Sequence, residues 1–186
     1  LPYTQLHKAL NWSSKKNKKE EVIKINKAEL LETLNKIRLS QLKLDSIIQS
    51  KKGNGSTEYL ILALFAEFGE MLNEWNLFKF WHSNPVVNED AWKEESIDIL
   101  HIAMTLLNEL TLSDYLEPIE QAIDLAFEVD YEESLLYLTT EPGDISNLVS
   151  WIAIAILPFK EDWAELETAY YKKHNKNIER ANNINY

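Results

Sequence analysis

The sequence predicts an all-α protein, and two observations carry the prediction. The 186 residues include only 4 Gly and 5 Pro, too few for the tight turns and glycine-rich loops on which sheets and βα units depend. Apolar residues recur at intervals of three and four, the period of a helix, and no apolar–polar alternation persists long enough for a strand. With 45% hydrophobic and 26% charged residues, the chain can bury one core. We expect a basic N-terminal extension over residues 1–27 and one helical domain over residues 28–186.

The first two helices are predicted from their apolar pattern and from a cap. Residues 29–50 carry apolar side chains three and four positions apart, as an amphipathic helix does. Residues 51–56 form a loop, and Ser56 or Thr57 can cap the helix that follows over residues 58–76. The first half of this second helix is apolar on all faces, so we expect it to be buried.

The later helices are predicted from their cap and stop residues. Asn88 is a good N-cap for a helix that ends near residue 110, and a loop at 81–87 precedes it. Further helices are expected after a cap at Ser113 or Asp114, as a short element within 130–141, from the cap Asp144 to Leu157 with Pro158 as the stop, and from Lys160 to about Lys173 before an Asn-rich tail.

The charge and cysteine content exclude several classes of function. The net charge is −11, and residues 53–159 hold 20 acidic against 2 basic residues, which disfavours direct binding to nucleic acid. The absence of Cys excludes thiolate metal sites and cysteine nucleophiles, and it fits a reducing, cytoplasmic location. No apolar run approaches the ~20 residues of a membrane span, and residues 1–11 lack a signal-peptide pattern. We therefore expect no membrane partner.

Two pairs of carboxylates stand in otherwise apolar segments. Glu67 and Glu70 are three residues apart and share a helix face, and Glu95 and Asp98 do the same on another helix. Buried carboxylates are costly unless a cation neutralises them. If the two helices pack antiparallel, four carboxylates converge into an all-oxygen site that suits Mg²⁺ or Mn²⁺. The alternative is two solvent-facing acidic stripes, and His101 in such a position is more often a core residue than a ligand.

The order and spacing of these pairs resemble the signature of the all-α nucleoside triphosphate pyrophosphohydrolases, which include MazG-type enzymes and the dimeric dUTPases. Five segments in the same order are similar to the dimeric dUTPase family: Gln41-Leu-Lys-Leu-Asp45, Glu67-Phe-Gly-Glu-Met-Leu-Asn73-Glu74, Phe78-Lys79-Phe80-Trp81, Glu94-Glu95-Ser-Ile-Asp98-Ile-Leu-His101 and Tyr170-Tyr-Lys-Lys173-x-x-x-Asn177-x-x-Arg180. We therefore expect a helical bundle with a four-helix core around an acidic metal site. The resemblance further implies a homodimer. In such a dimer, residues of the closing motif (the last of these segments, Tyr170 to Arg180) can complete the partner subunit's site.

The resemblance implies hydrolysis of dUTP to dUMP and pyrophosphate, which limits uracil in DNA. Two or three Mg²⁺ ions, or Mn²⁺, would be held by Glu67, Glu70, Glu95 and Asp98. Glu67 would orient or deprotonate the attacking water and Glu70 would bridge metals, although the sequence does not separate these roles. Phosphate contacts are implied for Lys173, Asn177, Arg180 and Lys79, and base or sugar contacts for Gln41, Trp81, His101 and Asn73.

Several of these residues also have a simpler interpretation, and two other functions are compatible with the pattern. Gln41 could be an ordinary helix-surface residue, Trp81 and the Phe residues beside it could serve packing, and Lys79 could be a surface lysine. One functional alternative is a MazG-like or dCTP-directed pyrophosphohydrolase with the same chemistry. Another is a non-enzymatic helical interaction or regulatory module that binds no metal. A P-loop NTPase is excluded because no GxxxxGK(S/T) motif is present.

Overall fold

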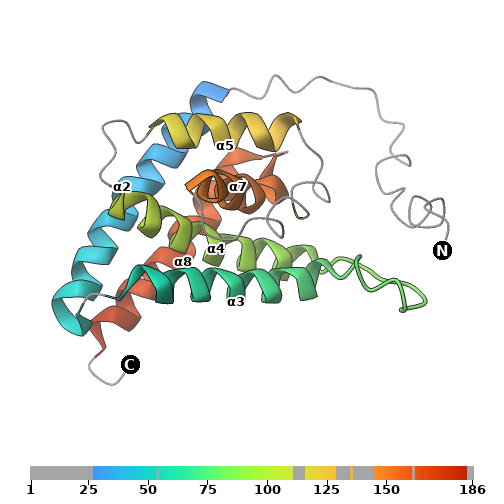
Figure 1. The fold of residues 1–186 in the computed structure, drawn as a ribbon, viewed down its shortest axis with the longest axis horizontal. Coiled ribbons are helices and arrows are strands. Elements are labelled where there is room, and N and C mark those ends of the chain that lie inside the picture. The colour runs from blue at the N-terminus through green and yellow to red at the C-terminus, as the bar shows by residue number, and fades with distance from the viewer. Residues whose placement is uncertain are drawn as a thin grey trace.

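The computed structural model describes residues 27–53, 55–110, 116–128, 135, 145–160 and 162–183. Within these ranges every regular element is a helix (Figure 1), and the helices in chain order are α2 (Lys27–Lys52), α3 (Thr57–Trp75), α4 (Glu89–Glu109), α5 (Leu116–Glu128), α7 (Ile145–Ile156), the 3₁₀ turn η1 (Leu157–Phe159) and α8 (Trp163–Asn182). The all-α prediction is confirmed. The extension over 1–27 apart from its last residue, the caps at Ser113, Asp114 and Asp144, and the helix predicted within 130–141 apart from Leu135 lie outside the described residues.

The long helix α4 is the centre of the bundle. It packs against α2, α3, α7 and α8, and its residues Ile99, Leu100, Ala103 and Met104 are completely buried. On one side, α7 lies between α4 and α5, and on the other side α3 lies against α4 (Figure 1). The apolar helix α7 is buried from Ile152 to Ile156, as expected for a helix without a polar face. The four helices α2, α3, α4 and α8 surround the region where the acidic pairs meet.

Helices α3 and α4 form an antiparallel pair. The start of α3 contacts the end of α4 where Thr57 Oγ1 donates to Glu109 Oε2 at 3.1 Å. At the opposite end, the backbone N of Asn88 donates to the carbonyl of Glu74 at 3.0 Å. Ser56 caps α3 as predicted, since its hydroxyl accepts from the backbone N of Tyr59. Asn88 occupies the predicted N-cap position of α4, but its side chain makes no cap bond there and instead donates to Glu74 Oε2 at 2.8 Å.

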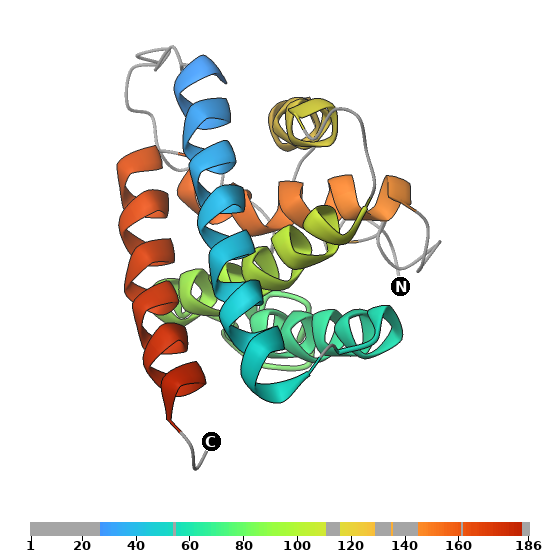
Figure 2. The ribbon, with the colours of Figure 1, turned by 90° about the vertical axis from the view of Figure 1, so that its left-hand side faces the viewer.

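The last helix is longer than predicted. The sequence led us to expect an end near Lys173, because the Asn-rich segment that follows has low helix propensity. The helix runs instead from Trp163 to Asn182, and it lies beside α2 along its length (Figure 2). Its second half still packs inward, since His174 is 6% and Ala181 8% exposed. Tertiary packing therefore overrides the local propensity, and it carries the whole closing motif on one rigid helix.

One face of α3 is exposed, which corrects the expectation of a helix buried on all sides. Leu64, Phe68 and Met71 face the core, whereas Tyr59 is 71% and Leu62 63% exposed. The apolar half of this helix therefore has two faces with different environments. The chain buries only one of them by itself, and the other is an apolar surface open to solvent.

Candidate active site

Three carboxylates from α3 and α4 come together in the bundle. Glu67 of α3 and Glu95 and Asp98 of α4 each offer an oxygen atom, and these oxygen atoms lie within 4.8 Å of one another. All three side chains are partly buried. They meet because α3 and α4 are antiparallel and because the helix period places these acids on the sides of the two helices that face each other. Oxygen donors at such spacing fit a hard divalent cation such as Mg²⁺ or Mn²⁺.

The negative charges of this acidic cluster (Glu67, Glu95 and Asp98) are only partly compensated by Lys173. Burial, together with the negative charges of Asp98, Glu70 and Glu67, raises the pKa of Glu95 to about 7. Burial and neighbouring carboxylates also raise the pKa of Glu67. The pKa of Asp98 is raised by burial, although Lys173 opposes the shift. A bound cation would favour the charged forms of all three groups, so the cluster is chemically suited to hold one.

Lys173 of α8 is the basic partner of the acidic cluster. Its Nζ lies 2.5 Å from Asp98 Oδ2 and 3.5 Å from Glu94 Oε1. Burial lowers the pKa of Lys173, but the contacts with Asp98 and Glu94 outweigh burial and leave this pKa raised. The ammonium group is therefore charged at neutral pH and available to a phosphate group.

The fourth predicted carboxylate lies at the edge of the acidic cluster. Glu70 is exposed and is not one of the three residues whose oxygen atoms converge. Its charge nevertheless contributes to the raised pKa values of Glu67 and Glu95. The structure therefore brings three of the four predicted ligands together and leaves Glu70 beside them with access to solvent.

A cavity of about 500 Å³ opens between α2, α4 and α8, and the start of α3 closes one side of it. His101 lines it one turn beyond Asp98 on α4, and Asn177 and Arg180 line it beyond Lys173 on α8. Its volume is in the range of about 300–1,000 Å³ that small-molecule sites have. Helix α4 carries residues of both the acidic cluster and the cavity, and α8 carries Lys173 and the cavity residues that follow it.

The wall of the cavity contains a buried polar network around Gln41. Gln41 Nε2 donates to Asp45 Oδ1 at 2.7 Å and to Thr105 Oγ1 at 3.0 Å. Gln41 Oε1 lies 2.6 Å from His101 Nδ1 and accepts from the Tyr170 hydroxyl at 3.0 Å. Burial, together with the charges of nearby groups, lowers the pKa of His101 to about 3, so this ring is neutral at pH 7.

Several members of this network have no role predicted from the sequence. Asp45 closes the family-like segment Gln41-Leu-Lys-Leu-Asp45, and it follows Gln41 by four residues, so both share a helix face; these were the available signals. His174 joins the network through its Nδ1, which lies 3.4 Å from the Tyr170 hydroxyl. Neither Thr105 nor His174 carried a sequence signal that separated it from ordinary helix residues. His101 stacks on Tyr170 with ring centroids 4.4 Å apart. Stacking and hydrogen bonds together fix the orientation of the imidazole.

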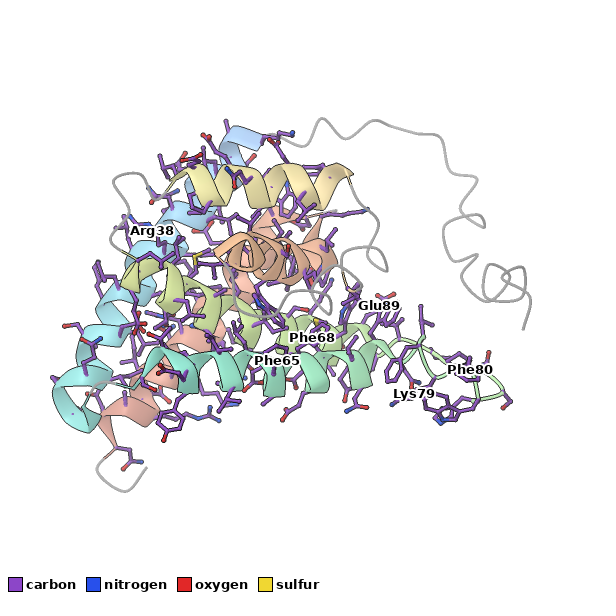
Figure 3. All side chains as sticks on the ribbon, viewed as in Figure 1. Arg38, Phe65, Phe68, Lys79, Phe80 and Glu89 are labelled. Atoms are coloured by element: carbon purple, nitrogen blue, oxygen red, sulfur yellow. The ribbon has the colours of Figure 1, made fainter. Side chains whose placement is uncertain are left out.

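Three residues predicted to contact the nucleotide lie away from the cavity. Trp81 is 61% exposed and stacks edge-on with Phe78 and Phe80. Lys79 Nζ contacts the carbonyl of Asn73 at 3.5 Å. Lys79 and Phe80 lie on a segment that projects beyond the joined ends of α3 and α4, away from the bundle (Figure 3). Trp81, Lys79 and Asn73 do not line the cavity.

The acidic cluster should destabilise the metal-free protein, and Glu95→Gln tests this. The folded state holds a proton on Glu95 up to a pH near 7, whereas the unfolded state loses it near pH 4.5. Stability of the metal-free chain therefore falls as pH rises through this window. We expect Glu95→Gln to raise Tm at pH 8 by about 2–4 °C, the effect of ~1 kcal/mol in a chain of this size, discounted because the side chain is partly exposed. The gain should vanish at pH 5 in differential scanning calorimetry, and an equal gain at both pH values would contradict it.

A helical bundle that gathers three partly buried carboxylates with a single lysine partner beside a cavity of this size belongs to the class of proteins that bind a cation together with an anionic small molecule. Comparison with known families makes this specific, since residues 33–186 match the family model described as dUTPase. The chain belongs to this dUTPase family, whose members are dUTP diphosphatases. No protein of curated function matches it significantly. Among the helices of the described ranges, none combines the length and the hydropathy needed to cross a membrane.

Proposed function

We propose that the protein hydrolyses dUTP to dUMP and pyrophosphate with Mg²⁺, or Mn²⁺, held by the acidic cluster, and so limits uracil in DNA. The observation that carries the proposal is the convergence of oxygen atoms from Glu67, Glu95 and Asp98 within 4.8 Å, next to a cavity of about 500 Å³. The membership of the dUTPase family supplies the nucleotide. The acidic cluster, together with Lys173, and the cavity both lie along α4 and α8. A nucleoside triphosphate needs such an arrangement, with a site for its phosphates next to a site for its nucleoside.

The carboxylates have complementary roles in this proposal. Glu67, Glu95 and Asp98 would hold the cations, and Glu70, exposed beside them, would join as a bridging ligand. Bound divalent cations neutralise a triphosphate and lower the pKa of a coordinated water. Glu67 is the group that would orient or deprotonate the attacking water, because it reaches the acidic cluster from α3 while the other two ligands come from α4.

The remaining contacts follow the direction of α4 and α8. Lys173 would exchange its bond with Asp98 for a phosphate oxygen, and Asn177 and Arg180 would contact the part of the nucleotide that enters the cavity. His101 Nε2 is buried without a partner among the described residues and lies one turn from Asp98, so it would accept a hydrogen bond from the sugar hydroxyl.

The exposed face of α3 supports the proposal of a homodimer. Tyr59, Leu62 and Phe65 are spaced by three residues, and their exposed fractions are 71%, 63% and 39%. A contiguous apolar face of this kind marks an association surface more often than an ordinary monomer surface. The projecting segment adds the exposed side chains of Phe80 and Val86. A second copy of the chain would cover these surfaces with a self-complementary interface.

Leu62→Arg tests the dimer, because it places a charge at the centre of the exposed α3 face. We expect it to convert a dimer into a monomer in size-exclusion chromatography with light scattering. Leu39→Arg is the matched control, since Leu39 is also exposed, at 44%, but lies on α2. A wild-type chain that is monomeric at ~50 μM, a concentration about 50-fold above the micromolar Kd of a weak dimer, would contradict the proposal.

A substrate panel tests the proposed reaction. Pyrophosphate release should be measured with Mg²⁺ from dUTP, dCTP, dTTP, dATP and UTP at equal concentration. We expect turnover of dUTP to dominate. Turnover centred on dCTP or another nucleotide would retain the metal chemistry and overturn the assignment of the base. No turnover of any nucleotide, together with no binding of Mg²⁺, would favour a helical interaction module.

A further inference from the structure

The amide of Gln41 is fully occupied by the protein itself. A Gln side chain offers two N–H donors and one carbonyl oxygen with two lone pairs. Both donors are used by Asp45 Oδ1 and Thr105 Oγ1, and the oxygen is used by His101 and Tyr170. A reversed amide would place its oxygen against Asp45 Oδ1, which also accepts from Thr105 Oγ1. Burial raises the pKa of Asp45, and the hydrogen bonds from Gln41 and Thr105 oppose this shift. Gln41 is also 3% exposed, so the predicted contact between Gln41 and the base is not available in this conformation.

The hydrogen bonds around Gln41 leave two acceptor atoms of its neighbours without a partner. His101 Nε2 and Asp45 Oδ2 are buried and have no hydrogen-bond partner within the described residues. The His101 ring is oriented by the oxygen of Gln41, which requires the proton on Nδ1 and leaves a lone pair on Nε2. Asp45 Oδ1 accepts from Gln41 and Thr105, which leaves Oδ2. An unpartnered buried acceptor costs about 1–3 kcal/mol, and a ligand that donates to it recovers this energy.

The positions of the two acceptors relative to the acidic cluster distinguish their roles. Both residues line the cavity. His101 lies one turn from Asp98, whereas Asp45 is bonded to Thr105, one further turn along α4. A nucleotide whose phosphates lie at the acidic cluster would therefore place its sugar near His101 and its base near Asp45. Asp45 is 9% exposed, so a base that reaches it is shielded from water.

We propose that Asp45 selects the base: its Oδ2 accepts the N3–H of uracil, and this contact discriminates dUTP from dCTP. Uracil presents N3–H as a donor between two carbonyl acceptors, whereas N3 of cytosine is an acceptor. An acceptor facing Asp45 Oδ2 would leave two unpaired lone pairs opposed in a buried site. Sites built to receive a substrate donor reject analogues that lack it by large factors. Gln41 and Thr105 are positioning residues, because they hold the carboxylate without touching the base.

The inference rests on the proposed function, and Asp45→Asn tests it without a change of shape. In this variant Oδ1 still accepts from Gln41 and Thr105, while Oδ2 becomes an N–H donor. We expect kcat/KM for dUTP to fall by about 10²-fold or more and the value for dCTP to rise relative to it. Asp90→Asn is the matched control: it is the same exchange at an exposed residue in the first turn of α4, outside the lining of the cavity, and it should leave the dUTP to dCTP ratio unchanged.

A substrate analogue tests the same inference without a variant that has to fold. N3-methyl-dUTP lacks the donor and can be assayed with the wild-type chain. We expect its kcat/KM to be at least ~10²-fold below that of dUTP. A wild-type chain that turns over both nucleotides equally would overturn the inference, as would a folded Asp45→Asn variant with an unchanged dUTP to dCTP ratio. If the wild-type chain does not hydrolyse dUTP at all, the proposed function itself fails. That outcome differs from loss of base selection alone.

Discussion

Replacing Asp98 by Asn is expected to lower kcat/KM for dUTP by about 10³-fold, because a metal ligand contributes several kcal/mol to the transition state. Asp98 joins the acidic cluster to α8. It lies close to Glu67 and Glu95 and bonds to Lys173 at 2.5 Å. The Asn side chain keeps the shape and one oxygen but loses the negative charge. The loss should appear together with weaker activation by Mg²⁺ in a pyrophosphate-release assay.

The control for this prediction is Asp90→Asn, the same exchange about two turns earlier on α4. Asp90 lies in the first turn of the helix and is exposed. We expect its kcat/KM to stay within about twofold of the wild type, since exposed charges away from the site contribute ~0–1 kcal/mol at most. An Asp98→Asn variant that stays folded and retains wild-type activity would contradict the placement of the metal site.

Lys173→Met is expected to change catalysis and metal binding in opposite directions. The variant should lower kcat/KM by about 10²-fold, because a charge-assisted donor to the phosphates is lost. It should also bind Mg²⁺ more tightly, since a positive charge 2.5 Å from Asp98 competes with a cation. Without metal, the variant should melt at a lower temperature than the wild type, because Asp98 loses its partner. Calorimetric titration with Mg²⁺ and steady-state kinetics measure the two effects separately.

Lys172→Met controls for the removal of a lysine from the same helix. Lys172 is exposed and precedes Lys173 directly, so its side chain points away from the acidic cluster. We expect unchanged Mg²⁺ affinity and unchanged kinetics. A Lys173→Met variant that binds Mg²⁺ more weakly than the wild type would show that the lysine supports the metal site and does not compete with it.

Much of the fold follows from local features of the sequence. The caps Ser56 and Asn88 and the apolar period located α3 and α4 to within one residue of their observed ends. The predicted end of α8 was wrong, because its Asn-rich second half is held as helix by packing of His174 and Ala181, which no local propensity contains. The exposed face of α3 was also missed. A run of apolar residues predicts that the helix surface is buried. It does not predict whether the same chain or another chain buries it.

The part of the candidate site that could be predicted from the sequence is the set of charged residues that stand in apolar, buried segments. Glu67, Glu70, Glu95 and Asp98 stood out because carboxylates in apolar segments need a cation or a proton, but the sequence did not show that Glu70 is exposed beside the other three. The contact of Lys173 with Asp98 joins residues 75 positions apart and depends on how α8 packs on α4. The network of Gln41, Asp45 and His101 could not be predicted without the packing of the helices, because the hydrogen bonds of a side-chain amide depend on which residues lie beside it. The residue types of the site could therefore be predicted from the sequence, but not which of them is free for a ligand.

Pyrophosphate release from dUTP during a titration with Mg²⁺, started from metal-free protein, tests the proposed metal-dependent hydrolysis most directly. We predict no turnover without a divalent cation and saturable activation as Mg²⁺ is added, with dUMP as the second product. The proposal is contradicted by turnover that is independent of divalent cations, or by a chain that binds Mg²⁺ at the acidic cluster and leaves dUTP intact.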